Sequence, residues 1–131
     1  MENQVREVLE SKNIQFRSHS TIKAKITASI AAFNSGLGVS MHAMKEHVLH
    51  FSDEGVVVLP VDESNGKVSK DSVVLLGNEI FDSIALQQKR FHYKLLIRTI
   101  HGDISYKVPK KALGFPEHKV NLAFLLIRLL S

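Results

Sequence analysis

Apolar residues recur at helical spacing near both ends of the chain and alternate with polar residues in much of the sequence between them. Near the start, Val5, Val8 and Leu9 stand at helical spacing among Glu, Gln, Arg and Lys residues. This pattern predicts a short amphipathic helix over residues 2–12, packed through one narrow stripe. Residues 24–33 alternate instead, which predicts a strand, although the alanines in this segment also permit a helix.

Residues 116–131 predict a second helix. Pro116 suits a first helical turn, where its missing N–H costs nothing, and Glu117 stands where a negative charge meets the positive end of the helix dipole. Apolar residues at helical spacing then form a stripe that is much wider than one narrow face. It consists of Val120, Ala123, Phe124, Ile127 and Leu130, widened by Leu122, Leu125, Leu126 and Leu129. We expect this stripe to be buried in the core, and the alternative is a helix that lies on a membrane or against a partner. The segment is too short to cross a bilayer, which needs about 20 apolar residues.

Two apolar runs flank the turn-forming residues 52–55 and predict a hairpin over residues 48–61. One face of this hairpin is apolar and the other is partly so. Pro60 is expected at the end of the ladder or on an unpaired edge. The predicted pairs are Phe51 with Val56, Leu49 with Val58, His50 with Val57, and Val48 with Leu59.

Three weaker signals follow this hairpin. Asn65 and Gly66 predict a turn before a short strand. Residues 73–76 form an apolar run that predicts a buried segment, and residues 80–86 begin a partly alternating one. These segments add further strands to the predicted sheet.

Residues 91–108 predict a second hairpin, with residues 100–103 as its loop. Its apolar face also receives Phe91 and Tyr93, which we expect in the core, and its other face is basic. A shift of one residue would mix the two faces, so the pattern specifies an outward basic side. The predicted pairs are Thr99 with Ile104, Ile97 with Tyr106, Leu95 with Val108, Arg98 with Ser105, and Leu96 with Lys107.

Composition indicates an ordinary folded protein. The chain has 131 residues, of which 44% are hydrophobic and 23% charged, and we expect one domain over residues 1–131. Residues 1–21 would form the first helix and its connection, and residues 22–131 the core. The absence of cysteine excludes disulfides and thiol catalysis and fits a reducing compartment, so a cytoplasmic location is expected. The first residues do not have the pattern of a signal peptide.

Together the elements predict an α+β fold with a leading helix, about six or seven antiparallel strands and a closing helix. The order of these elements resembles that of the bacterial pleckstrin-homology-like (PH-like) domains. The segments that carry the resemblance are HVLHFSDEGVVVLPVD, then EIFDSIALQQ followed by FHYKLLIRTIHGDISYKV, and finally PEHKVNLAFLLIRLL. The resemblance covers residues 22–130. It implies a curved antiparallel β-barrel or sandwich capped by the C-terminal helix, and a role as an interaction or scaffold module.

The seven histidines do not predict a metal site. On a strand His47 and His50 would point to opposite faces, and on a helix His42 and His47 would not stack. The sequence also contains no nucleophile elbow, HExxH motif or phosphate-binding loop. We therefore expect no catalytic residues, no metal and no cofactor.

Basic residues near the second hairpin are the best candidates for binding a partner, because they can contact anionic groups. The formal net charge of +4 is in keeping with such a role, while the alternative is a solvated outer face of the sheet. The leading hypothesis is a non-catalytic PH-like binding module whose partner is a protein or an anionic membrane surface. A nucleic-acid-binding domain is the runner-up, and a homo-oligomer through an exposed strand edge is a further alternative. The candidate residues are Lys89, Arg90, His92, Lys94, Arg98, Lys107, Lys110 and Lys111.

Overall fold

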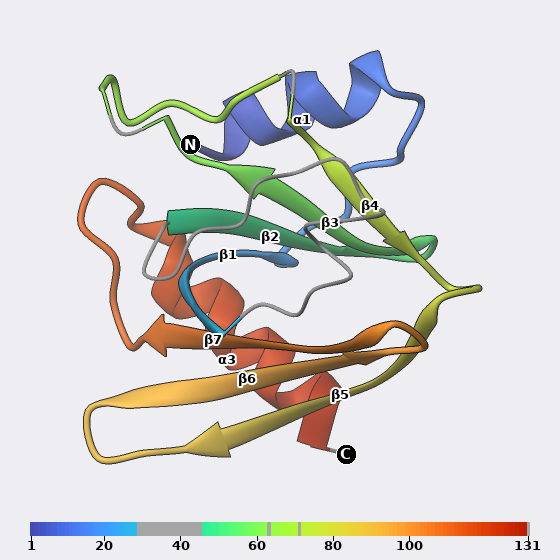
Figure 1. Ribbon diagram of the computed structural model, residues 1–131. Coiled ribbons are helices and arrows are strands. Elements are labelled where there is room, and N and C mark those ends of the chain that lie inside the picture. The colour runs from blue at the N-terminus through green and yellow to red at the C-terminus, as the bar shows by residue number, and fades with distance from the viewer. Residues whose placement is uncertain (29–45, 63, 71, 131) are drawn as a thin grey trace.

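The computed structural model describes residues 1–28, 46–62, 64–70 and 72–130. These residues form two helices and one seven-stranded antiparallel sheet, so the predicted α+β fold is confirmed (Figure 1). In chain order the elements are α1 (Glu2–Ser11), β1 (Thr21–Ala28), β2 (Glu46–Ser52), β3 (Gly55–Pro60), β4 (Val74–Gly77), β5 (Phe81–Gln88), β6 (His92–Thr99), β7 (Gly102–Pro109) and α3 (Glu117–Leu130).

The described strands lie in the order β4-β3-β2-β1-β7-β6-β5, and every neighbouring pair is antiparallel. Neighbours in the sheet are neighbours in the sequence except for β1 and β7, which meet in its middle. β4 and β5 therefore form the two edges of the described sheet. The pairing of β1 with β7 places residues from the two ends of the strand region side by side on one surface.

One buried core receives residues from all seven strands and from α3. Because every strand faces the same core, the sheet curves around it, and α3 lies across its concave side from β1 to β5 (Figure 1). Burying one such Leu or Ile side chain contributes roughly 1.5–3 kcal/mol. The core includes Ile22, Leu49, Val58, Leu76, Leu86, Ile97, Tyr106, Leu122 and Leu125.

A second, smaller core lies on the opposite face of the sheet, where α1 packs on β2 and β3. The stripe predicted from the sequence is confirmed, because Val5, Val8 and Leu9 are all buried. Both faces of the hairpin formed by β2 and β3 are therefore covered, which explains why the second face of this hairpin is partly apolar. The strand residues beneath α1 include Val48, Val57 and Leu59.

The predicted register of the first hairpin is confirmed at every pair. The Ser52 hydroxyl donates to the carbonyl of Gly55 and accepts the N–H of Glu54, which fixes the turn. Gly55 has a φ of +134°, and a Cβ there would collide with the carbonyl oxygen of Leu76 on β4. Pro60 ends the ladder, as predicted.

The predicted register of the second hairpin is wrong by two residues. Thr99 pairs with Gly102 rather than Ile104, so the turn contains only two residues in place of the predicted four-residue loop. The Thr99 hydroxyl tightens this turn, because it donates to the Gly102 carbonyl at 2.8 Å and accepts the N–H of His101 at 3.1 Å. A shift of two leaves every side chain on its predicted face. The outward basic side is thus retained with different partners across the strands.

The closing helix is present, but only part of the predicted wide stripe is buried. Leu122 and Leu125 enter the core beside the polar residues His118 and Asn121. Asn121 fits there because its amide donates to the Thr21 carbonyl and to the Glu2 carboxylate. Leu126 and Leu129 of the predicted stripe also pack against the core, whereas its other described members face solvent. Its exposed members are Val120, Ala123, Phe124 and Ile127.

Three weaker predictions are met in part. β1 begins at Thr21, and residues 29–33 of the predicted strand lie outside the described residues. The predicted turn is present, with Gly66 at a φ of +69°. In the described part of the segment that follows, the only pairing is one bridge between Val61 and Val68.

Candidate anion-binding surface

Three lysines form a row across the outer face of three adjacent strands. Lys94 of β6 pairs with Lys107 of β7, which in turn pairs with Lys25 of β1. All three side chains are exposed, because the alternate positions on these strands, such as Tyr106 and Ala24, enter the core. Side chains directly opposite each other on antiparallel strands have Cβ atoms about 5 Å apart. The row therefore concentrates three positive charges at the centre of the sheet.

No carboxylate in the described part of the chain forms an ion pair with this row. The ion pairs found there join Arg17 with Asp53 at 2.9 Å and Lys23 with Glu46 at 3.2 Å. Like charges directly opposite each other destabilise a sheet by roughly 0.2–1 kcal/mol per pair. An anion bound over Lys25, Lys94 and Lys107 would relieve this repulsion.

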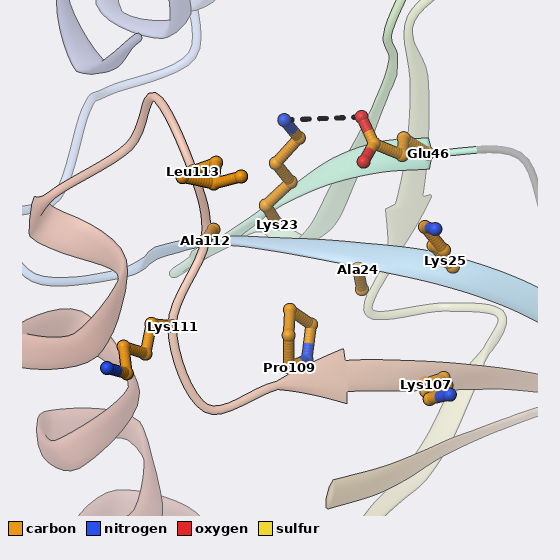
Figure 2. Close-up of a pocket in the computed structure, with 9 residues that line it drawn as sticks. All are labelled: Lys23, Ala24, Lys25, Glu46, Lys107, Pro109, Lys111, Ala112 and Leu113. Atoms are coloured by element: carbon orange, nitrogen blue, oxygen red, sulfur yellow. Dashed lines mark ion pairs between the residues drawn. The ribbon is translucent and has the colours of Figure 1, made fainter. Parts of the chain in front are cut away.

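A pocket of about 390 Å³ opens beside the row, and Figure 2 shows its lining. Lys25 and Lys107 project at one side, and Lys111 lies across the opening on the loop between β7 and α3. Lys23 points toward Glu46, with which it pairs. The remaining walls are apolar and come from Ala24, Pro109, Ala112 and Leu113.

The pocket lies where β1 and β7 cease to pair. Their register would set Lys23 opposite Pro109, but the ladder ends at Lys25 and Lys107. The His118 ring from α3 takes the place of the next rung. Its Nδ1 accepts the Lys23 N–H at 3.0 Å, and its Nε2–H donates to the Pro109 carbonyl at 2.6 Å. Burial lowers the pKa of His118, in keeping with the neutral ring that these two bonds require.

A second hollow, of about 430 Å³, lies on the other side of Lys107, which lines both. Most of its lining is basic and comes from β6 and the turn before it. The two hollows and the lysine row form one continuous basic surface over β1, β6 and β7. The polar and basic lining of the second hollow consists of Thr27, Lys89, Arg90, His92, Lys94 and Lys107.

Two exposed apolar side chains flank this surface. Phe91 is 76% exposed in the turn before β6, next to Arg90, whose guanidinium carbon lies 5.2 Å from the ring centroid. Leu113 is 95% exposed on the loop after β7. The expectation that Phe91 belongs to the core is wrong, because β6 begins only at His92 and the residue stands in a turn. Tyr93, by contrast, packs against the core as expected.

Six of the eight predicted basic residues line this surface, and Lys110 and Arg98 do not. Lys89, Arg90, His92 and Lys94 line the second hollow, Lys111 lines the first, and Lys107 lines both. Lys110 reaches over the ring of Tyr93 at 6.0 Å. Arg98 lies outside both linings, toward the far end of β6, where it is paired in register with Asp103.

Two residues of the surface, Lys23 and Lys25, are not among those predicted from the sequence. Both lysines alternate with the apolar residues Ile22, Ala24 and Ile26, and this alternation indicates that the lysines point outward from a strand. Their proximity to Lys107 depends on the pairing of β1 with β7, which are far apart in the sequence. Periodicity within a segment does not determine such a pairing.

Two of the clustered histidines point to opposite faces, as predicted for a strand. His47 shares a hydrogen bond of 2.9 Å with the hydroxyl of Tyr106 in the core, and His50 bonds Thr21 at 2.7 Å on the outer side. Burial raises the pKa of the Tyr106 hydroxyl. His42 lies outside the described residues. Among the residues that are described, no three His, Asp or Glu side chains gather as a metal site would require.

Neither described helix has the length and apolarity needed to cross a membrane. Comparisons with protein-family models, with curated proteins and with solved structures found no match to this chain.

Proposed function

We propose that this protein is a non-catalytic binding module with a PH-like fold, whose basic surface binds an anionic membrane. The observation that carries the proposal is the row of Lys25, Lys107 and Lys94, which forms no ion pair in the described part of the chain. Glu46 stands opposite Lys25 in the register of β1 and β2, but its carboxylate pairs with Lys23. Repulsion among these lysines destabilises the sheet, and an external anion bound to the row would compensate this cost.

The PH-like part of the proposal is supported by the arrangement of the elements. Seven antiparallel strands surround one core, and the helix that follows them lies across the concave side of the sheet. The short leading helix lies outside this unit, on the outer face of β2 and β3. The non-catalytic part is supported by His50 and His118, whose ring nitrogens hold together the backbone and side chains of the fold.

A membrane surface suits the chemistry better than an acidic protein, because basic and large apolar side chains occur together. Each Lys or Arg near an anionic leaflet contributes about 1 kcal/mol of attraction. Phe91 and Leu113 extend from turns beside these charges, where they can enter the headgroup region of a bilayer. Anionic lipids are concentrated in the cytoplasmic leaflet, which agrees with the cytoplasmic location expected from the composition.

Vesicle sedimentation tests the proposal. We expect binding to vesicles that contain phosphatidylserine and none to pure phosphatidylcholine vesicles. Binding should weaken several-fold between about 100 mM and about 500 mM salt, because the Debye length falls from about 10 Å to less than half of that. Equal binding to both vesicle types would contradict the electrostatic basis of the proposal, and absence of binding to either would refute the membrane as partner.

Single-stranded nucleic acid is the second candidate, favoured by the exposed ring of Phe91 beside Arg90. A base stacked on such a ring contributes roughly 1–3 kcal/mol, and the lysine row would meet the phosphates. Titration of a labelled oligonucleotide at the same two salt concentrations separates the candidates. Salt-sensitive oligonucleotide binding that Phe91→Ala weakens, without vesicle binding, would favour the nucleic acid.

A further inference from the structure

The outward face of α3 is apolar although its inward face already fills the core. Val120 is 51% exposed, Phe124 47% and Ile127 72%, and Ala123 lies between them on the same face. These four residues, which we call the α3 stripe, stand at positions i, i+3, i+4 and i+7 of one helix. A helix that is apolar on all sides is normally covered on all sides.

We propose that the α3 stripe is the contact surface of a homodimer in which two α3 helices pack antiparallel about a two-fold axis. The stripe is self-complementary for this arrangement. Val120 and Ile127 lie at equal distances from a point between Ala123 and Phe124, so an axis at this point sets each Val120 against the Ile127 of the second copy. Ala123 near the centre leaves room for the two backbones to approach.

The charges at the ends of α3 suit the same arrangement. Glu117 is in the first turn and Arg128 in the last, and eleven residues at 100° each leave the two about 20° apart around the helix. In the antiparallel pair, Glu117 of one copy and Arg128 of the second copy lie on the same flank, about 3 Å apart along the common axis. The Arg128 guanidinium also donates to the Ser20 hydroxyl at 2.9 Å.

The stripe is also held in place before any partner binds. The ring of His19 stacks on Phe124 with centroids 4.2 Å apart and an interplanar angle of 7°. His19 has a φ of +56°, so the connection before β1 is shaped to present the ring to α3. A fixed side chain loses less conformational entropy on association than a free one.

The size of the helix predicts a weak dimer. α3 has 14 residues and is therefore about 21 Å long. One helix pair of this length buries less than the roughly 1,200 Å² of a typical stable interface, so we expect a dissociation constant in the micromolar range or weaker. The stripe is separate from the basic surface, and the dimer does not depend on the proposed membrane binding.

Disulfide trapping tests the proposal, because the chain has no cysteine of its own. Ala123→Cys introduces one thiol near the two-fold axis, where its counterpart on the second copy is within disulfide distance. We expect a covalent dimer to form under mild oxidation at least tenfold faster than with Leu113→Cys, whose side chain is 95% exposed off the helix. Equal rates for both variants would refute the arrangement.

Sedimentation velocity over a range of concentrations provides the equilibrium test. Ile127→Glu should weaken self-association at least tenfold while the circular dichroism spectrum stays unchanged, because the residue is 72% exposed. Phe91→Glu, which changes another exposed apolar residue in the same way, should leave it unchanged. A chain that is monomeric at all concentrations would refute the dimer. The dimer is equally refuted if Ile127→Glu abolishes vesicle binding without affecting association, which would assign the stripe to the membrane.

Discussion

The buried imidazole of His50 makes the stability of this fold depend on pH. Its Nε2 accepts the backbone N–H of Arg17 at 3.1 Å, so its proton is on Nδ1, which lies 2.7 Å from the hydroxyl of Thr21. The ring is also stacked on Phe16 at 5.0 Å. Protonation of Nε2 would break the bond to Arg17 and bury a charge. Burial, and to a lesser extent the positive charges of Arg128 and Arg17, lower the pKa of His50 from 6.5 to about 4.

The sign of the effect follows from the direction of this change in pKa. In the unfolded chain His50 takes up a proton near pH 6.5, whereas in the folded chain it does so only near pH 4. The unfolded state therefore binds more protons between these values, and stability falls as the pH falls. A difference from 6.5 to about 4 corresponds to roughly 3 kcal/mol. This contribution is complete above pH 6.5 and is lost as the pH approaches 4.

Urea unfolding at a series of pH values measures this contribution. His50→Gln removes the titrating group but keeps an oxygen that can accept the Arg17 N–H. Between about pH 7 and about pH 4 the wild type should lose roughly 3 kcal/mol more than the variant. Other titrating groups, including His118, act in both proteins and cancel in the difference. Parallel pH profiles would refute the assignment of a buried, neutral His50.

Two further substitutions test the packing of α3. Leu125→Ala should destabilise the chain by about 2–5 kcal/mol, because the side chain is buried in the main core. Ile127→Ala should change the unfolding free energy by less than about 1 kcal/mol, and the opposite ranking would contradict the face that α3 buries. His118→Ala should cost about 2–4 kcal/mol in thermal or urea unfolding, because it leaves a backbone donor and acceptor without their partner. The exposed His101→Ala is its control, and equal effects would contradict the bridge between β1 and β7.

The sequence predicts the parts of this fold that depend on local pattern. The register of β2 with β3 follows from a turn whose length is evident in residues 52–55 and from apolar pairs that match at each step. The hairpin of β6 and β7 has the same clarity of faces, but its turn length is set by the hydroxyl of Thr99. Alternation determines which face a residue occupies and is unchanged by a shift of two.

The remaining features depend on contacts between distant segments. In α3 the apolar residues surround the helix, so periodicity alone does not select the buried face. The selection depends on Asn121 and His118, which have partners only where β1 and β7 lie side by side. The same pairing adds Lys25 to the basic surface predicted around Lys94 and Lys107.

The most direct test of the central claim is vesicle binding by two charge-matched double variants. Lys94→Glu with Lys107→Glu reverses two charges of the row, and Lys67→Glu with Lys70→Glu reverses two exposed lysines in the segment before β4. If the row binds the anionic surface, the first variant should bind phosphatidylserine vesicles at least roughly 30-fold more weakly than the wild type, from about 1 kcal/mol per lysine. The second should show a much smaller loss, which reflects net charge alone. Equal losses in the two variants would contradict a specific role for the row.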